Sequence, residues 1–246
     1  MKLILLRHGE SEWNLQNRFT GWRDVSLTDK GIEEAKFSAE QILNNNFNVK
    51  SVHTSLLNRA TETTKIVTKI INFPNDDIVY DWRLNERHYG ALQGLNKSET
   101  AMKYGEEQVK IWRRSFDIPP PLLDKNDNRH PRFDNKFKFI GEKLPSGESL
   151  KNVIERLSPF WKKYINFVKE NKGCHLIVAH SNSLRAIVKT LDKLSKEEII
   201  SINLPTGVPL VYTLDNHLNV LKKEFLIDKD ELIIKQKKII EQGKIK

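Results

Sequence analysis

The chain has little of several features that usually identify a protein class. It contains one cysteine, Cys174, in 246 residues, so no disulfide can form within it, which suits a reducing compartment. It has no histidines at the HExxH spacing and no GxxxxGK[ST] loop, so the common zinc-hydrolase and nucleotide-binding motifs are excluded. No apolar run is long enough to cross a membrane, and the apolar start at 3–6 is too short for a signal peptide. We therefore expect a cytoplasmic protein that needs no metal.

Basic residues exceed acidic ones, 41 to 32, which gives a formal net charge of +9. A lysine-rich solvated surface explains the excess most simply, and attraction of small polyanions is the alternative. A nucleic-acid partner is not expected, because no basic stripe interleaved with aromatic residues is present. The length suits one large α/β domain.

Two apolar runs end in the same way, each at a histidine followed by small residues. Leu3–Leu6 is followed by Arg7 and His8, and Leu176–Ala179 is followed by His180. A continuous apolar run bounded by turn residues is typical of a strand buried on both faces of a parallel sheet. Ligands of such sheets bind beyond the carboxyl ends of the strands. The pattern therefore places both histidines at one functional edge, far apart in sequence and close in space.

The neighbours of the two histidines indicate the chemistry of that edge. A neutral imidazole is a good phosphoryl acceptor, and guanidinium groups such as those of Arg7 and Arg185 match phosphate geometry. Gly9 would let backbone N–H groups approach an anion where a helix begins. A single histidine of this kind more often ends a core strand and does nothing else. Two of them, with arginines nearby, predict a site that holds and transfers a phosphate.

The rest of the chain predicts alternating strands and helices. Strands are expected at 2–7, 49–54, 78–80 and 176–179, with an edge hairpin of 208–214 and 220–226; helices are expected at 28–46, 55–71, 98–112 and 148–170, and after residue 182. This order predicts an α/β three-layer sandwich, in which helices flank a mostly parallel central sheet.

Two segments depart from this alternation within a single domain of residues 1–246. Residues 92–146 contain Pro119-Pro120-Pro121, many charges and little periodicity, and we interpret them as an insertion over the site. Residues 228–246 alternate isoleucine with lysine and glutamine, so they can form a basic amphipathic helix.

Longer blocks of sequence carry a family resemblance. Arg7-His8-Gly9-Glu10-Ser11 is the RHGE-type signature of the histidine phosphatase superfamily. Narrower blocks are Phe19-Thr20-Gly21-Trp22, Trp82 to Gly90, Leu92 to Lys97, Ile111-Trp112-Arg113-Arg114, and Asn203 to Tyr212. Together and in this order they resemble the cofactor-dependent phosphoglycerate mutases, from the first strand to about the last twenty residues.

This resemblance implies an isomerase of glycolysis and gluconeogenesis that interconverts 3-phosphoglycerate and 2-phosphoglycerate. 2,3-Bisphosphoglycerate would prime a phosphohistidine on His8, whose other ring nitrogen should donate to a fixed acceptor such as a backbone carbonyl. Glu86 would give and take the substrate proton. The transferring phosphoryl group would be bound by Arg7, Arg59 and His180.

The same blocks imply the residues that bind substrate and cofactor. They are Arg7, Gly9, Glu10, Ser11, Asn14, Thr20, Gly21, Arg59, Glu86, Arg87, His88, Tyr89, Lys97, Arg113, Arg114, Ser181 and Asn182. Ser181 stands where the resembled family has glycine, and it can offer its N–H or hydroxyl to phosphate only if its φ is allowed. A homo-oligomer, either dimer or tetramer, and a mobile basic tail at 228–246 are also implied, without a membrane or nucleic-acid partner.

Two alternatives to a mutase stay open. A bisphosphoglycerate synthase or phosphatase on the same scaffold would share His8, His180 and their arginines. The long insertion favours a mutase, because a mutase must exclude water from its phosphohistidine. A non-catalytic protein that binds polyanions would use the basic charge alone, and the presence of His8, Glu86 and His180 argues against it.

Overall fold

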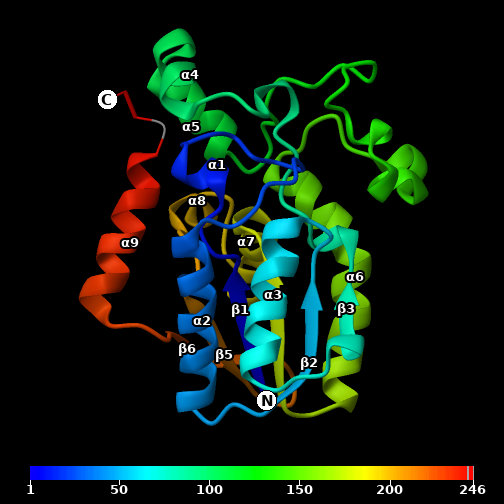
Figure 1. Ribbon diagram of the computed structural model, residues 1–246, viewed down its shortest axis with the longest axis vertical. Helices are drawn as coiled ribbons and strands as arrows, with labels where there is room; N and C mark the ends of the chain where they lie inside the picture. Colours follow the sequence, from blue (N-terminus) through cyan, green and yellow to red (C-terminus); the bar gives the residue numbers. More distant parts are fainter. Residues whose placement is uncertain (243, 246) are drawn as a thin grey trace.

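A computed structural model describes residues 1–242, 244 and 245 (Figure 1), and its centre is a six-stranded sheet with the order β3-β2-β4-β1-β5-β6. The strands are β1 (Lys2–Arg7), β2 (Val49–Thr54), β3 (Ile78–Tyr80), β4 (Cys174–Ala179), β5 (Pro209–Leu214) and β6 (Val220–Phe225). Five of these six strands run in the same direction, and β5 runs opposite to them. The prediction of a mostly parallel sheet with a hairpin at its edge is therefore confirmed.

β1 and β4 lie side by side at the centre of the sheet, and their register sets the position of the two histidines. Both strands are almost fully buried, as their unbroken apolar sequences predict. Arg7 pairs with Ala179, and the backbone N–H of His8 donates to the Ala179 carbonyl at 3.0 Å. His8 and His180 therefore leave the sheet together at its carboxyl edge.

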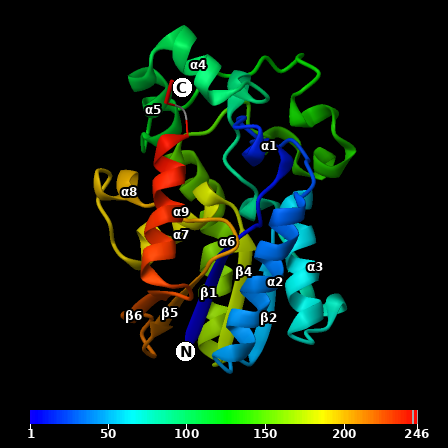
Figure 2. The ribbon, with the colours of Figure 1, turned by 60° about the vertical axis from the view of Figure 1, so that its left-hand side comes forward.

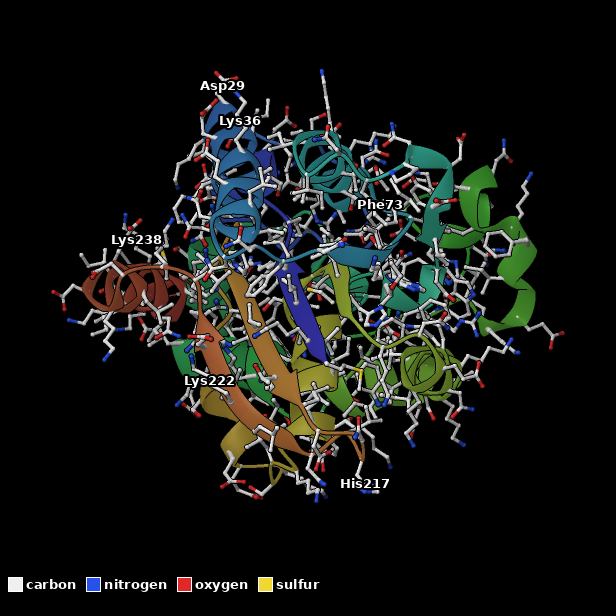
Figure 3. All side chains as sticks on the ribbon, turned by 90° about the horizontal axis from the view of Figure 1, so that it is seen from below. Asp29, Lys36, Phe73, His217, Lys222 and Lys238 are labelled. Atoms are coloured by element: carbon white, nitrogen blue, oxygen red, sulfur yellow. The ribbon has the colours of Figure 1, made fainter. Side chains whose placement is uncertain are left out.

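Helices cover both faces of the sheet and complete the three layers, as the view from below shows (Figure 3). On one face, α2 (Asp29–Asn44) and α3 (Asn58–Ile70) pack against β1, β2 and β4. On the other face, α6 (Leu150–Glu170) and α7 (Ser181–Leu191) pack against β1, β4 and β5. The predicted three-layer α/β sandwich is confirmed.

The structure corrects one predicted helix. The expected helix at 98–112 is two helices, α4 (Lys97–Tyr104) and α5 (Glu106–Arg114). Gly105 lies between them with φ of +86°, a conformation that ends a right-handed helix and that glycine adopts at little cost. Both helices lie above the carboxyl edge of the sheet (Figures 1 and 2).

The remaining elements are short and lie in the connecting segments. They are helices α1 (Glu12–Leu15) and α8 (Glu198–Ser201), and the 3₁₀ turns Asn75–Asp77, Trp82–Leu84, Gly90–Leu92, Pro131–Phe133 and Asn135–Lys143. Within the described residues, no helix is long and apolar enough to cross a membrane.

The carboxyl-terminal segment forms α9 (Lys229–Glu241), which runs from the edge of the sheet toward α5 (Figures 1 and 2). None of the residues of α9 is buried, so apolar burial contributes little to its position. Residues 243 and 246 of the expected tail lie outside the described residues. The mobility of this tail stays a prediction.

Candidate active site

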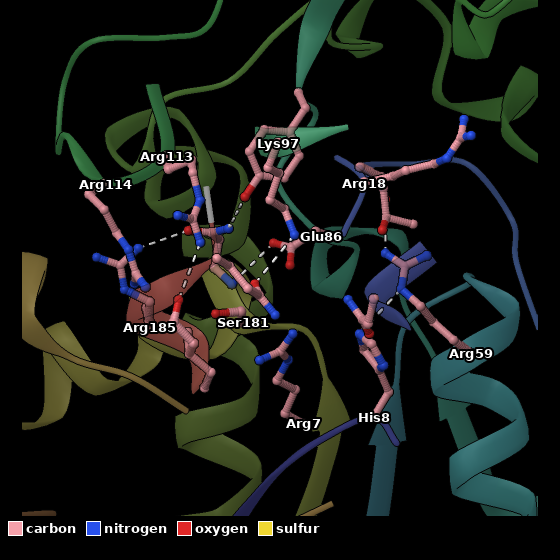
Figure 4. A pocket seen from close by; sticks show the side chains of 17 residues that line it. Arg7, His8, Arg18, Arg59, Glu86, Lys97, Arg113, Arg114, Ser181 and Arg185 are labelled. Carbon is pink, nitrogen blue, oxygen red and sulfur yellow. Dashed lines mark hydrogen bonds between the residues drawn. The ribbon is translucent and has the colours of Figure 1, made fainter. Parts of the chain in front are cut away.

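The carboxyl edge of the sheet opens into a cavity whose walls come from almost the whole length of the chain (Figure 4). The lining residues are Arg7, His8, Asn14, Arg18, Thr20, Gly21, Arg59, Glu86, Tyr89, Lys97, Arg113, Arg114, Ser181, Asn182, Arg185, Ile239 and Gln242. Six arginines and one lysine are in this set, and Glu86 is its single carboxylate. The cavity is therefore built for an anion with several negative charges.

His8 is held in one tautomer and is kept neutral. Its Nδ1 lies 2.7 Å from the carbonyl oxygen of Gly9, and a carbonyl only accepts hydrogen bonds, so Nδ1 carries the hydrogen. Nε2 accordingly carries the lone pair, toward which Arg59 donates from Nε at 3.2 Å. Burial and the charges of Arg59 and Arg7 place the pKa of His8 well below its usual value. A neutral imidazole with Nε2 facing the cavity is a competent nucleophile.

His180 packs against His8 with the two ring centroids 5.0 Å apart. Its Nε2 lies 2.7 Å from the hydroxyl oxygen of Ser55, which follows β2. His180 is the residue before α7, so the amino end of that helix points at the same space. Burial and the nearby Arg59 hold the pKa of His180 well below its usual value.

Arg7 and Arg59 are buried, and neither forms a salt bridge with a carboxylate among the residues that the structure describes. Arg7 donates from Nη1 to the carbonyl of Leu204 at 2.9 Å, while its buried Nε has no protein partner. Arg59 donates from Nη2 to the carbonyl of Gly21 at 2.9 Å. Backbone carbonyls fix both side chains without neutralising them, so their charges stay available to an anion beside His8.

Glu86 lies across the cavity with a fixed carboxylate. Its Oε1 accepts the backbone N–H of Arg87 at 2.7 Å and that of Asn182 at 3.1 Å. In Figure 4 Glu86 stands between the group of His8 and Arg59 and the group of Arg113, Arg114 and Arg185. This position suits a group that exchanges a proton with a ligand spanning the cavity.

The described residues contain no group of three or more histidine, cysteine, aspartate or glutamate side chains that could hold a metal ion. The lining groups are donors of hydrogen bonds rather than oxygen ligands, which fits a phosphate and does not fit a divalent cation.

Comparison with known proteins places the chain in a family. The model of the Histidine phosphatase superfamily (branch 1) matches residues 3–127 and 122–223. This chain belongs to the histidine phosphatase superfamily. A 2,3-bisphosphoglycerate-dependent phosphoglycerate mutase of Hydrogenobaculum is 51% identical over 94% of both chains. A protein of the same name from Borreliella afzelii is 48% identical over 100% of this chain and 99% of the relative.

Solved structures of superfamily members share the fold. The mycobacterial glucosyl-3-phosphoglycerate phosphatase complexed with VO3 aligns with a TM-score of 0.69 at 20% identity, over 92% of this chain and 98% of that one. The alpha-ribazole phosphatase of Shigella flexneri aligns with a TM-score of 0.64 at 20% identity, over 89% and 93%. At this identity the likeness shows the histidine phosphatase fold alone.

Most of the binding residues named from the sequence line the cavity, but six do not: Gly9, Glu10, Ser11, Arg87, His88 and the fully buried His180. The N–H of Gly9 donates to the hydroxyl of Thr63 at 3.0 Å, and a Cβ on Gly9 would lie 2.1 Å from the carbonyl oxygen of Gly31. The glycine is therefore needed for close packing against α2, and its approach to an anion stays a prediction.

Glu10 and Ser11 both form contacts within the fold that give them a structural role. The Glu10 carboxylate pairs with Lys30 at 2.7 Å. Ser11 caps α1 through its hydroxyl and shares a capping box with Asn14. Of this group only Asn14 reaches the cavity.

Arg87 and His88 lie behind the cavity wall. Arg87 is fully buried, donates from Nη2 to the carbonyl of Arg113 at 2.7 Å, and stacks its guanidinium over Tyr89. His88 accepts the N–H of Gly90 at its Nδ1, and burial lowers its pKa to about 3. Both residues support the wall.

The structure adds four lining residues that sequence reasoning did not assign to the site: Arg18, Arg185, Ile239 and Gln242. Arg185 stands five positions after His180, and this proximity already indicated phosphate chemistry without assigning Arg185 a place in the site. Ile239 and Gln242 belong to the tail, where isoleucine, lysine and glutamine recur so regularly that no single position stands out as functional. Arg18 had no distinguishing pattern.

Ser181 is the first residue of α7 and lines the cavity (Figure 4). It is not among the residues with positive φ, so its backbone has an ordinary helical conformation. Serine thus replaces glycine at this position without backbone strain.

Proposed function

We propose that this chain is a 2,3-bisphosphoglycerate-dependent phosphoglycerate mutase that interconverts 3-phosphoglycerate and 2-phosphoglycerate. The observation that carries the proposal is the presentation of His8, with Nδ1 on the Gly9 carbonyl and Nε2 facing a cationic cavity. The two relatives at about half identity over nearly the full chain support the same activity.

The residues present fit 2,3-bisphosphoglycerate as primer. The buried Nε atoms of Arg7 and Arg185 lack protein partners, and Lys97 faces the cavity with the amide oxygen of Gln242 as its partner at 3.3 Å. Unused donors of this kind are what a bisphosphorylated acid would occupy. When bound, the primer supplies the phosphoryl group that His8 carries.

In the first transfer, His8 would form a bond from Nε2 to the phosphorus while the bond between phosphorus and the leaving oxygen breaks, and Glu86 would give a proton to that oxygen. Arg7, Arg59 and His180 surround this position and stabilise the charge spread over the equatorial oxygens. The hydrogen bond from Nδ1 to Gly9 strengthens as the ring becomes positive.

In the second transfer, phospho-His8 gives its phosphoryl group to the free hydroxyl of the monophosphate, and Glu86 takes the hydroxyl proton. His8 would then take the other phosphoryl group on Nε2, while Glu86 would give the proton back to the oxygen that leaves. The proton and the phosphoryl group each return to where they began, so no net hydrolysis occurs.

A mutase must also protect its phosphohistidine from water. Three segments contribute to the cavity lining above the sheet: α4 through Lys97, α5 through Arg113, and the end of the chain through Ile239 in α9 and Gln242 just after it. Arg113 donates from Nη2 to the carbonyl of Ile239 at 3.4 Å. This cover favours transfer to a sugar-acid hydroxyl over transfer to water.

The test is an assay of 2-phosphoglycerate formation from 3-phosphoglycerate, with and without 2,3-bisphosphoglycerate, alongside an assay of phosphate release. We expect strong stimulation by the bisphosphate, little phosphate release, and full turnover after dialysis against a chelator. Dominant phosphate release would favour a phosphatase, net accumulation of bisphosphate a synthase, and binding without turnover a polyanion-binding protein.

We further infer a cytoplasmic homo-oligomer, a dimer or tetramer, as in the resembled family. Light scattering on a gel-filtration peak measures the mass in solution. A monomeric mass at micromolar concentration would refute this part of the proposal.

A further inference from the structure

Arg185 is a buried arginine in the cavity wall for which the mechanism above has no role. It is 1% exposed and has no carboxylate within salt-bridge distance among the described residues. Burial and the charges of Arg114 and Arg87 lower its pKa to about 9. An unpaired buried guanidinium is costly compared with an apolar side chain of similar size. Its presence therefore calls for a functional reason.

The hydrogen bonds of Arg185 point to that reason. Nη1 donates to the side-chain oxygen Oδ1 of Asn182 at 2.9 Å, one turn earlier on α7. Nη2 donates to the carbonyl of Ile199 in α8 at 2.7 Å. The planar guanidinium is thereby fixed at two points, and it grips Asn182 in one orientation.

Asn182 lines the cavity, and its side-chain amide has an oxygen that accepts hydrogen bonds and a nitrogen that donates them. Arginine only donates hydrogen bonds, so the amide oxygen of Asn182 must face Arg185 and the amide nitrogen must face the other way. That nitrogen, Nδ2, lies 3.4 Å from the hydroxyl of Tyr89, another lining residue. The backbone N–H of Asn182 meanwhile donates to Glu86. Asn182 thus contacts Glu86, the proposed proton carrier, through its backbone, and its side-chain nitrogen is placed to donate to a ligand.

We propose that Arg185 is a positioning residue that holds the Asn182 amide so that its nitrogen donates to the anionic group of the substrate that is not being transferred. The proposal rests on the proposed function. Figure 4 places Arg185 with Arg113 and Arg114 on the opposite side of Glu86 from His8 and Arg59. The group bound there is therefore the carboxylate or the second phosphate, and not the phosphoryl group on its way to His8.

Loss of Arg185 should act on capture of the phosphoglycerate and spare the chemistry at His8. Without the guanidinium, the Asn182 amide can turn and present its oxygen to an anion, which repels instead of binding. A lost hydrogen bond involving a charged group corresponds to about 10- to 100-fold in affinity. The hydrogen bonds of His8 to Gly9 and Arg59 do not involve α7 and stay unchanged.

The experiment compares Arg185→Met, Arg185→Lys, Asn182→Ala and the double variant Arg185→Met/Asn182→Ala. We expect Arg185→Met to raise KM for 3-phosphoglycerate by about 10- to 100-fold while kcat changes by less than about threefold. Rates are normalised to active sites by titrating phosphohistidine with labelled 2,3-bisphosphoglycerate, which removes any loss caused by unfolding. Arg132→Met, at an exposed arginine outside the cavity, is the matched control.

Arg185→Lys should restore only part of the affinity, because one ammonium cannot bridge Asn182 and Ile199 in the same geometry. The double variant should be no worse than Arg185→Met alone within about threefold, because both changes remove the same donor. Additive effects on KM, or an unchanged KM in Arg185→Met, would refute positioning through Asn182. If the wild type hydrolyses phosphoglycerate instead of isomerising it, the proposed function fails, and the same KM comparison on hydrolysis still tests Arg185.

Discussion

Nε of Arg59 lies 3.2 Å from Nε2 of His8, so a fixed cation faces the lone pair of the proposed nucleophile. The same guanidinium is fixed to the carbonyls of Arg23 and Gly21 through its other two nitrogens. Arg59 therefore keeps its place when a phosphoryl group arrives, and its Nε hydrogen bond can pass from His8 to a phosphoryl oxygen. The Arg59 Nε–H that donates to His8 would then stabilise the negative charge of the phosphoryl group during transfer.

We expect incubation with labelled 2,3-bisphosphoglycerate to phosphorylate His8. The phosphoramidate formed on Nε2 should be labile in acid and stable in base, as a phosphohistidine is. His8→Ala should take up no label and should lose mutase turnover. Label retained by that variant would assign the nucleophile to another residue.

Glu86→Gln should impair transfer to the substrate more than phosphorylation of His8. The amide can keep the size of the carboxylate but cannot exchange a proton, and loss of a general acid–base group costs about 10²- to 10⁴-fold in rate. Rapid-quench measurement of phosphohistidine formation, next to steady-state mutase turnover, separates the two steps. Near-normal turnover would mean that another group carries the proton.

Binding of 3-phosphoglycerate should take up a proton at Lys97. Burial, then the charges of Arg113 and Arg7, hold the pKa of Lys97 well below its usual value. A bound anion favours the ammonium form and raises that pKa, so protons are taken up at any pH between the free and bound values. Calorimetric titrations at several pH values, each in two buffers of different ionisation enthalpy, should give heats that depend on the buffer over part of that range. Lys97→Met should abolish the difference, and a difference that persists would place the proton elsewhere.

Stability should fall as the pH is lowered from about 6.5 to about 4, partly because of His53. Within the described part of the chain, neither ring nitrogen of His53 has a hydrogen-bond partner, and the ring lies among Phe160, Tyr164 and Phe167. Burial lowers its pKa to about 4. The folded state binds the proton less tightly than the unfolded state, so this contribution is complete above pH 6.5 and is lost on acidification. At pH 4.5 the loss is about 2–3 kcal/mol.

Urea unfolding at pH 7 and pH 4.5 measures this loss. His53→Leu should flatten the dependence on pH, while His217→Leu, at an exposed histidine, should leave it unchanged. An equally steep dependence in His53→Leu would show that other groups, such as His88, account for all of it.

Ser181→Gly should change mutase turnover by less than about tenfold, or about 1.4 kcal/mol. Ser181 already has a helical backbone conformation at the start of α7, so glycine would relieve no strain. Its N–H is available in either case. A large gain in turnover would mean that the hydroxyl crowds the anion, and would point to a weakened mutase.

The sequence predicts the layers and the functional edge because both depend on long, simple patterns. Apolar runs at 3–6 and 176–179 can only be strands buried on both faces, and parallel pairing then brings His8 and His180 together. The sequence also leads to the expected tautomer of His8, because a neutral imidazole nucleophile needs a fixed acceptor for the hydrogen on its other ring nitrogen. The structure supplies the identity of that acceptor, the Gly9 carbonyl.

The parts that sequence analysis did not predict depend on contacts between distant segments. The role of Gly9 is set by its approach to Gly31, and nothing in either local pattern shows it. The break at Gly105 resembles a tolerated helix glycine until its positive φ is known. Arg87 and His88 belong to a block with Glu86 and Tyr89, but only the two outer residues of these four line the cavity, and no simple period of the sequence shows which ones do.

Cys174 in β4 is buried, so we expect the native protein to react little with thiol reagents. It is 6% exposed, and burial raises its pKa to about 12, so almost no thiolate is present near neutral pH. Because the chain has no other cysteine, a cysteine introduced on α9 at the exposed Ile240 would be the one position that a maleimide dye modifies. Such a dye would give an optical readout of the helix at the cavity mouth during turnover, against a background free of other signals.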